Sequence, residues 1–274
     1  MTDTRIDLDD ARRAILADTE PVGGHEIVAT DEAVGRVLGR AVEAPLSLPP
    51  FPASAMDGYA LRSRDVAGEP PYRLHVAGVS YAGHPLEGVV PPGTCVRIFT
   101  GAAMPEGLDA VVIQEDCVRR GDEVVVSEPV AAGQNVRPIA HDVAAGSCLF
   151  DAGHRLGEFD TAWLAACGIS AVTVHRRPLV AIFSTGDELT EPGDHLGPGR
   201  IFDANRHALR TLLAHLPVDV EDLGIVDDSR EAIRKTLEYA DTSCDVVVTS
   251  GGVSVGDADW VRGVVDEIGH LRLW

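Results

Sequence analysis

The sequence has little positive charge and almost no lysine. Lys235 is the only lysine among 23 basic residues, which face 43 acidic ones and leave the 274-residue chain with a formal net charge of −20. Nucleic acids and anionic membranes attract proteins through basic surfaces, so neither is expected as a partner. The other basic residues are arginines. They favour bidentate contacts with oxyanions, although coding bias or a high-salt habitat would give the same composition.

Paired cysteines and long apolar runs are also missing. The five cysteines are widely spaced without a C-x-x-C pair, and the ten histidines show no metal-binding spacing. Neither a disulfide framework nor a structural zinc site is therefore suggested, and a reducing cytoplasm fits best. The N-terminus carries acids and arginines where a signal peptide has an apolar core, and no run of about 18 apolar residues occurs. A cytoplasmic protein without a membrane anchor is expected.

The chain changes character along its length, which suits two or three domains. Helices are predicted over 7–18, capped by Asp7, and over 30–38. Four prolines between 45 and 52 then force an extended crossing. Short apolar runs at 74–76, 95–99, 110–113 and 124–126, separated by turn residues, predict strands. We expect N-terminal helices over 1–44 and an inserted all-β domain over 45–149. A further helix should begin near 157 and end at Gly168, within a segment 150–177 that packs with residues 1–44.

After Pro178 the pattern alternates between strands and helices. Strands are predicted over 179–183, 218–223, 245–249 and 271–274, and helices over 206–216, 229–240 and 258–268. Such alternation is typical of right-handed βαβ crossovers and a parallel sheet. We therefore expect a doubly wound α/β domain over 178–274, so that the whole chain is multidomain, α/β plus all-β.

Ligands of open parallel sheets bind outside the carboxyl ends of the strands, and here those ends lead into loops rich in acid and glycine. Gly251 and Gly252 would let backbone N–H groups approach an anion, and the hydroxyls of Ser250 and Ser254 add donors. Carboxylates beside such a cradle would repel a phosphate unless a divalent cation lay between them, and Mg²⁺ suits Asp and Glu. The pattern favours metal-assisted chemistry on a phosphate ester or anhydride.

Each of these features also has a purely structural explanation. A Gly-Gly pair after a strand is more often a tight turn than an anion site. Asp228 and Glu231 form a D-x-x-E pattern, so a helix cap explains Asp228 as well as a metal role does. Asp203 and Asn205 precede a predicted helix, and capping is the better explanation there.

Four motifs in order make the pattern specific. They are Ser54-Ala-Met-Asp-Gly-Tyr-Ala60, Thr100-Gly-Ala102 with Asp109-Ala-Val-Val112, Ser184-Thr-Gly-Asp-Glu-Leu189, and Thr249-Ser-Gly-Gly-Val-Ser-Val-Gly256. Over essentially its whole length the chain resembles the molybdopterin molybdenumtransferase family, to which the gephyrin E domain belongs. The resemblance implies a role in molybdenum cofactor biosynthesis: Mg²⁺-dependent insertion of molybdate into adenylylated molybdopterin, with release of AMP.

The resemblance also implies site residues and partners. Positions matching the family's catalytic site are Asp57, Thr100, Asp142, Glu188, Asp228 and Asp259, and Glu188, Asp228 and Asp259 would hold the metal. Residues matching its cofactor-binding loops are Thr185, Gly186, Asp187, Ser250, Gly251, Gly252 and Ser254. The family forms homodimers with a shared cleft, so residues 1–44 and 150–177 would serve dimerisation, and Asp57 and Thr100 would face the partner's α/β domain. A molybdopterin adenylyltransferase is a further expected partner.

The chain departs from the family pattern at three places. Ala140 replaces a loop glycine near Asp142, and Ala204 replaces a usual Ser or Thr. The sequence stops at Trp274, before a Pro-Gly-Lys-Pro segment and a small β domain, so the α/β domain is expected to be incomplete. A catalytically impaired scaffold or regulatory paralogue that binds molybdopterin is therefore the alternative function. A third hypothesis is an α/β phosphoanhydride hydrolase. The predicted β domain over 45–149, with its Ser54–Ala60 motif, argues against it.

Overall fold

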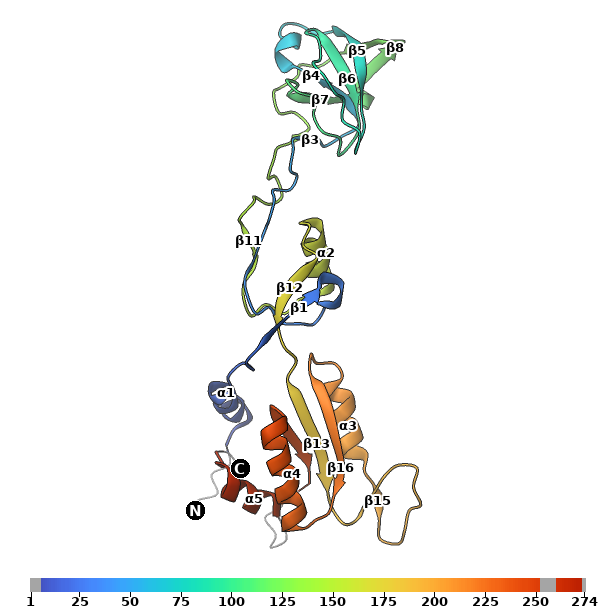
Figure 1. Cartoon of the computed structure of the whole chain (residues 1–274). Coiled ribbons are helices and arrows are strands. Elements are labelled where there is room, and N and C mark those ends of the chain that lie inside the picture. The colour runs from blue at the N-terminus through green and yellow to red at the C-terminus, as the bar shows by residue number, and fades with distance from the viewer. Residues whose placement is uncertain (1–5, 252–259, 273–274) are drawn as a thin grey trace. The chain divides into compact units, whose positions relative to one another are not determined.

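The computed structural model describes residues 6–251 and 260–272, and these ranges contain no helix long and apolar enough to cross a bilayer. The chain forms two compact units (Figure 1). One comprises Met1–Arg40, Gly153–Thr161 and Ala171–Trp274, and the other comprises Ala41–Ala152 and Ala162–Ser170. The division into three domains stays a prediction.

The first helix confirms the sequence prediction. Helix α1 spans Leu8–Asp18, and the carboxylate of Asp7 caps it by accepting the amide of Asp9 at 2.9 Å. Its apolar side chains are exposed, since Leu8 is 81%, Ile15 57% and Leu16 63% accessible. The helix thus presents an apolar face that its own unit does not bury.

The second predicted helix, over 30–38, is wrong. Only a 3-10 turn forms, at Thr30–Glu32. Gly35 then adopts a φ of +79°, and Leu38 makes an isolated bridge with Val174. A helix cannot continue through a left-handed residue into an extended segment.

An antiparallel strand pair, missed by the sequence analysis, joins distant parts of the first unit. Strand β1 (His25–Ala29) pairs with β12 (Ala171–His175), His25 opposite His175. Between them in sequence lies α2 (Glu158–Ala166), which was predicted. Gly168 ends it with a φ of +77° while the Ile169 amide reaches the Leu164 carbonyl at 2.9 Å.

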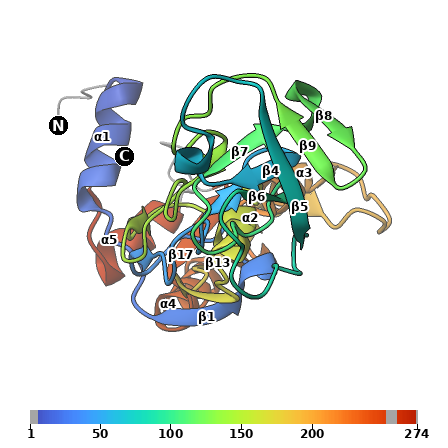
Figure 2. The ribbon, with the colours of Figure 1, turned by 90° about the horizontal axis from the view of Figure 1, so that it is seen from above.

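The second unit is built around a six-stranded sheet of order β7-β4-β6-β5-β9-β8. Its strands are β4 (Gly58–Leu61), β5 (Tyr72–Ser80), β6 (Thr94–Ile98), β7 (Ala110–Ile113), β8 (Cys117–Arg120) and β9 (Glu123–Val126). Only β5 and β6 pair in parallel, and β8 and β9 form a hairpin at one edge (Figure 2). Apolar clusters containing Cys95 and Val96, successive residues of β6, show that both faces are buried. The four predicted strands are confirmed.

Two short ribbons complete this unit. Strand β2 (Val42–Glu43) pairs with β11 (Cys148–Phe150), and β3 (Ala53–Ser54) pairs with β10 (Val136–Arg137). All pairings in these ribbons are antiparallel. The segment with the four prolines is therefore non-helical, as its sequence predicts. Its bridge to a returning segment, between Leu48 and Val143, was not predicted.

The rest of the first unit is the α/β region. It contains β13 (Leu179–Thr185), α3 (Ala204–Leu213), β16 (Asp219–Val226), α4 (Arg230–Ser243), β17 (Val246–Ser250) and α5 (Trp260–Ile268). The strands run parallel in the order β16-β13-β17. A small ribbon of β14 (Leu189–Thr190) and β15 (Ile201–Phe202) follows β13. Of the predicted strand 271–274, residues 271 and 272 are irregular and the other two lie outside the described residues.

Helices cover both faces of this sheet. Phe183 packs with Ile233 of α4 and Val261 of α5, whereas the next residue, Ser184, binds Asp203 at the start of α3. Successive strand residues point to opposite faces, so α3 lies on one face and α4 with α5 on the other (Figure 1). The chain leaves β13 for β16 on one side and returns to β17 on the other. That reversal opens a crevice at the carboxyl ends of β13 and β17.

Candidate functional site

A pocket occupies the crevice at the carboxyl ends of β13 and β17. Its volume is about 240 Å³, and it lies where the sequence predicts a ligand. The end of β13, the β14–β15 ribbon, the start of α3 and the end of β17 supply the lining residues, which are Thr185, Glu188, Leu189, Ile201, Phe202, Asp203, Ala204, Asn205, Ser250 and Gly251.

Two glycines shape this pocket through close approach. A Cβ on Gly251 would lie 2.6 Å from the carbonyl oxygen of Thr185, and its φ is +104°. A Cβ on Gly186, with a φ of +152°, would lie 2.6 Å from a carboxylate oxygen of Glu188. Glycine at 251 lets the ends of β13 and β17 meet, and glycine at 186 leaves room for the Glu188 carboxylate.

The start of α3 brings positive backbone charge to the pocket. Asp203, 1% exposed, caps the helix by accepting the Arg206 amide at 3.2 Å, which confirms the capping interpretation for Asp203. For Asn205 that interpretation is wrong, because Asn205 lies inside α3. As at any helix start, the first N–H groups, here those of Ala204 and Asn205, have no intrahelical acceptor. Together with the hydroxyl of Ser250, they form a donor set suited to an oxyanion.

The capping explanation of Asp228 is wrong. Ser229 caps α4, its hydroxyl accepting the Ala232 amide at 3.3 Å. The Asp228 carboxylate instead accepts the hydroxyl of Thr185 at 3.3 Å. Asp228 is therefore attached to the pocket through Thr185, a residue that is only 7% exposed.

A buried arginine that the sequence analysis missed organises the back of the pocket. Arg206, 4% exposed, donates to Asp203 at 2.9 Å, to both oxygens of Asp222 at 2.6 Å, and to Glu191. These partners come from the α3 cap, from β16 and from the loop between β14 and β15. Asp222 was the available signal, because a carboxylate inside a predicted strand needs a cationic partner.

The structure brings some predicted site residues together and leaves others apart. Thr185, Glu188, Ser250 and Gly251 line the pocket, Asp228 contacts Thr185, and Gly186 and Asp187 lie in the same loop. Asp57, Thr100 and Asp142 belong to the other unit. Gly252, Ser254 and Asp259 lie outside the described residues.

The acidic residues near the pocket can be tested for their fit to a metal. Within 6–251 and 260–272, no three His, Cys, Asp or Glu side chains converge closely enough to hold one. Mg²⁺, however, is usually held by one or two carboxylates together with substrate phosphates and water. The oxygen donors of Glu188 and Asp228 fit that mode of binding.

Asp57 and Thr100 are in direct contact. The amide and the hydroxyl of Thr100 both donate to Oδ1 of Asp57 at 2.8 Å. These two hydrogen bonds, assisted by the charge of Arg97, lower the pKa of the Asp57 carboxyl. The pair therefore presents a firmly ionised carboxylate on the β unit.

Asp142 lies on an exposed loop of the same unit. Its amide donates to the Leu48 carbonyl at 2.9 Å. Two residues earlier, Ala140 has a φ of +61°, so the position matching the family's glycine keeps a left-handed conformation. An alanine there costs about 1 kcal/mol relative to an unstrained conformation.

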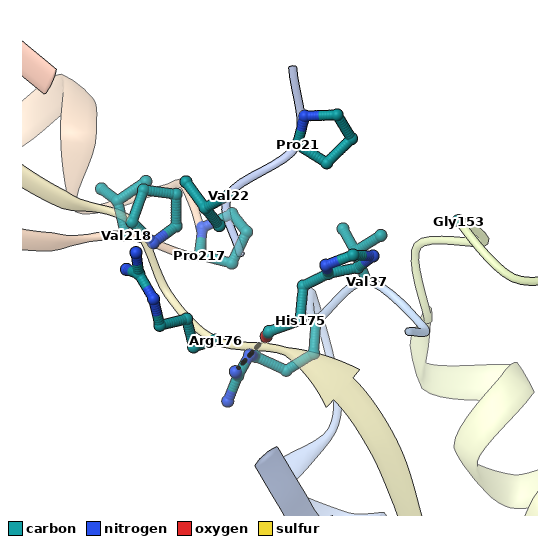
Figure 3. Close-up of a pocket in the computed structure, with 10 residues that line it drawn as sticks. Pro21, Val22, Val37, Gly153, His175, Arg176, Pro217 and Val218 are labelled. Carbon is teal, nitrogen blue, oxygen red and sulfur yellow. Dashed lines mark hydrogen bonds between the residues drawn. The ribbon is translucent and has the colours of Figure 1, made fainter. Parts of the chain in front are cut away.

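A second cavity, of about 390 Å³, lies in the first unit (Figure 3). Pro21, Val22, Pro217 and Val218 give it a largely apolar wall. The guanidinium of Arg36 at this cavity is already bonded to the His175 carbonyl at 2.7 Å and to Glu26. It therefore suits an oxyanion less well than the pocket at the sheet edge.

Comparisons with known proteins show which family the chain resembles. Residues 6–168 match the family described as "MoeA N-terminal region (domain I and II)", and residues 181–273 match "Probable molybdopterin binding domain". The chain is 34% identical to a solved molybdopterin biosynthesis MoeA protein from Pyrococcus horikoshii, with a TM-score of 0.82 over 96% of this chain and 67% of that one.

Three curated relatives show the same relationship. A molybdopterin molybdenumtransferase of Haemophilus influenzae is 38% identical over 98% of this chain, one of Nostoc is 40% identical over 90%, and gephyrin of Dictyostelium discoideum is 33% identical over 97%. The chain spans 66%, 58% and 40% of their respective lengths. The match to the MoeA N-terminal region alone, over residues 6–168, covers more than half of this chain. The chain therefore belongs to the MoeA family of molybdopterin molybdenumtransferases.

Proposed function

We propose that this chain acts in molybdenum cofactor biosynthesis as a molybdopterin molybdenumtransferase. In the proposed reaction water cleaves the phosphoanhydride of adenylylated molybdopterin into AMP and the molybdopterin phosphate. The two dithiolene thiols bind the molybdenum of molybdate, and their protons leave with one molybdate oxygen as water. The observation that carries the proposal is the pocket in which Ser250 and the start of α3 supply anion donors beside Glu188. Both the anhydride and molybdate are oxyanions, which such donors recognise.

Mg²⁺ would be held by Glu188 and Asp228, with Asp259 expected as a third ligand from the family resemblance, and it would neutralise charge on the phosphates. The chain's own residues do the positioning. The α3 N-terminus and the Ser250 hydroxyl orient the oxyanion, and Gly251 lets the end of β17 approach the carbonyl of Thr185 at the end of β13. Arg206 holds Asp203, and with it the start of α3, in place.

The direct test is AMP release. Purified chain is mixed with adenylylated molybdopterin, molybdate and Mg²⁺, and AMP is quantified by chromatography. We expect release that depends on molybdate and stops when EDTA removes the metal. Binding of the pterin without any molybdate-dependent release would instead favour the non-catalytic scaffold.

Asp228→Ala should reduce this turnover by about 100-fold, because the variant loses a carboxylate beside the anion site. It should cost less than about 1 kcal/mol of stability, since within residues 6–251 and 260–272 the Asp228 side chain loses a single hydrogen bond, that from Thr185 at 3.3 Å. Turnover and thermal unfolding are measured on the same samples.

Ser229→Ala is the matched control for Asp228→Ala. It removes the helix cap at the neighbouring position, so it should cost about 1 kcal/mol of stability and leave turnover within about twofold. The metal role of Asp228 is refuted when its alanine variant turns over as fast as wild type, or when both variants lose stability and activity equally.

The proposed partner is a second copy of the chain. Five apolar side chains of the first unit are more than half exposed, which favours an apolar interface between copies. They are Leu8, Ile15 and Leu16 of α1, Ile27 of β1 and Phe159 of α2. Sedimentation equilibrium should give the mass of a dimer, and a monomer at micromolar concentration would contradict it.

A molybdopterin adenylyltransferase would deliver the substrate. The cytoplasm is the proposed location, because its reducing conditions suit the five free cysteines.

A further inference from the structure

One wall of the pocket at the carboxyl ends of β13 and β17 is apolar and partly open to solvent. Leu189 of β14 and Ile201 and Phe202 of β15 line the pocket together, and we name these three residues the ribbon wall. Leu189 is half-buried, whereas Ile201 is 57% and Phe202 44% exposed. Removing apolar surface from water is favourable, so a ligand that covers the ribbon wall gains affinity from it.

The ribbon wall is held in place before any ligand arrives. The Ile201 amide donates to the Glu188 carbonyl at 2.8 Å, which joins β15 to the start of β14. Directly after β14, the Glu191 carboxylate accepts a hydrogen bond from the buried Arg206 of α3. A surface that is ordered beforehand loses little conformational entropy when a ligand binds.

Hydrogen-bond donors lie next to this apolar wall. The Ser250 hydroxyl and the first N–H groups of α3, those of Ala204 and Asn205, form the donor set suited to an oxyanion. Phe202 precedes Ala204 by two residues, and two residues span at most about 7 Å. A ligand that uses both features therefore carries an oxyanion joined to an apolar or planar body, as an organic phosphate ester does.

The chemistry of the ribbon wall distinguishes between the two ring systems of the proposed substrate. Its side chains offer a phenyl ring and two branched alkyl groups, which have no hydrogen-bonding atoms. A pterin would bring its polar 2-amino-4-oxo edge against this wall, and polar groups buried without partners are costly. Adenine has a single amino group and no carbonyl, and purine faces stack well on aromatic side chains. The ribbon wall therefore favours adenine.

We propose that the ribbon wall binds the adenine ring of adenylate, with the ring stacked on Phe202 and the phosphate of the same nucleotide at Ser250 and the start of α3. This assignment rests on the proposed function, because adenylate is part of that substrate and is its released product. Phe202 sets the preference for a nucleotide over an inorganic oxyanion. Glu191 does not contact the nucleotide. It holds the ribbon through Arg206 and is a positioning residue.

The test is calorimetric titration of the full chain, in buffer containing Mg²⁺, with AMP and with ribose 5-phosphate, which has the same phosphate and no base. The wild type should bind AMP about tenfold more tightly than ribose 5-phosphate. Phe202→Ala should weaken AMP binding about tenfold and leave ribose 5-phosphate binding within about twofold, because only the stacking face is lost. Phe202→Tyr retains that face and should keep AMP binding within about twofold.

Leu212→Ala is the matched control on α3. Leu212 is 67% exposed and does not line the pocket, so both affinities should stay at their wild-type values. Unchanged binding of ribose 5-phosphate by Phe202→Ala also shows that this variant is folded, since the donor set must be intact to hold the phosphate.

Five results would overturn the assignment. They are no saturable AMP binding by the wild type, equal wild-type affinities for AMP and ribose 5-phosphate, unchanged AMP binding by Phe202→Ala, an equal loss for both ligands in that variant, and a loss that falls on 6-hydroxymethylpterin instead of AMP.

Failure of this assignment can be told from failure of the proposed function, because molybdate-dependent AMP release is measured separately. A chain that releases AMP although Phe202 has no effect on AMP binding keeps the function and loses the adenine site. A chain that binds AMP through Phe202 but shows no molybdate-dependent release keeps the adenine site alone.

Discussion

Arg206→Leu should lower the free energy of unfolding by about 3–5 kcal/mol. Arg206 is the only cation within 3 Å of Asp203 and Asp222 among the ion pairs of the described residues. Removing one partner of a buried ion pair leaves the other charges without compensation, and that costs more than the pair itself contributes. Asp203 is 1% exposed, so water cannot replace the lost guanidinium.

Arg210→Leu is the matched control, made on the same helix. Arg210 also pairs with Asp222, but at 3.8 Å and with 54% of its side chain exposed, so its loss should cost less than about 1 kcal/mol. Denaturant unfolding of the two variants gives the comparison. Equal losses would show that Arg206 is no more than another surface cation.

The pH dependence gives Arg206→Leu a second readout. Burial raises the pKa of Asp222, but the hydrogen bonds from Arg206 and from the Gly224 amide, together with the charges of Arg206 and Arg210, more than offset it, and the net pKa is lowered. A lowered folded pKa contributes stability above the unfolded value near 4 and loses it as the pH falls further. The deficit of Arg206→Leu relative to wild type should therefore be largest at neutral pH and shrink below about pH 4.

The order of helices and strands in the α/β region could be predicted because its pattern is local. Apolar runs such as Leu179–Phe183 alternate with amphipathic stretches, and burial of Ile233 and Leu237 on α4 bears out the period. The position of the pocket followed from the same pattern. Ligands lie at carboxyl strand ends in any such sheet, and the pocket at Thr185 and Ser250 is there.

The features of the fold that could not be predicted from the sequence depend on pairings between distant residues. Strands β1 and β12 are five residues each, far apart in the chain, and the exposed residues of β1 carry no alternating pattern. Tyr81 and Phe99 meet only because β5 and β6 pair in parallel, with Val79 opposite Arg97. No periodicity within either strand indicates its partner.

The mistaken cap at Asp228 has a different origin. Asp228 and Ser229 are adjacent and both are good capping residues, so the sequence pattern allows α4 to start at either. Packing decides between them, since Ile233 and Leu237 must face the cluster around Phe183. With α4 in this orientation, Ser229 is the N-cap, and the Asp228 carboxylate accepts the Thr185 hydroxyl instead.

Gly58→Ala should destabilise the β unit by about 3 kcal/mol or more. Gly58 lies in β4 between β6 and β7, opposite Ile98 and Ile113. A Cβ there would lie 2.0 Å from the carbonyl oxygen of Val112 and 2.9 Å from its carbon. These are backbone atoms of the neighbouring strand, so no side chain can move aside and the β4–β7 pairing must open.

Gly78→Ala, in β5 of the same sheet, is the matched control. Its Cβ would meet the methyl groups of Leu86 at 3.0 and 3.2 Å, and these lie at the end of a flexible side chain. We expect it to cost less than about 1 kcal/mol, and thermal unfolding of both variants makes the comparison. If Gly58→Ala and Gly78→Ala unfold at the same temperature, the edge strand β7 can move away from β4 at little cost. Packing then does not require a glycine at position 58.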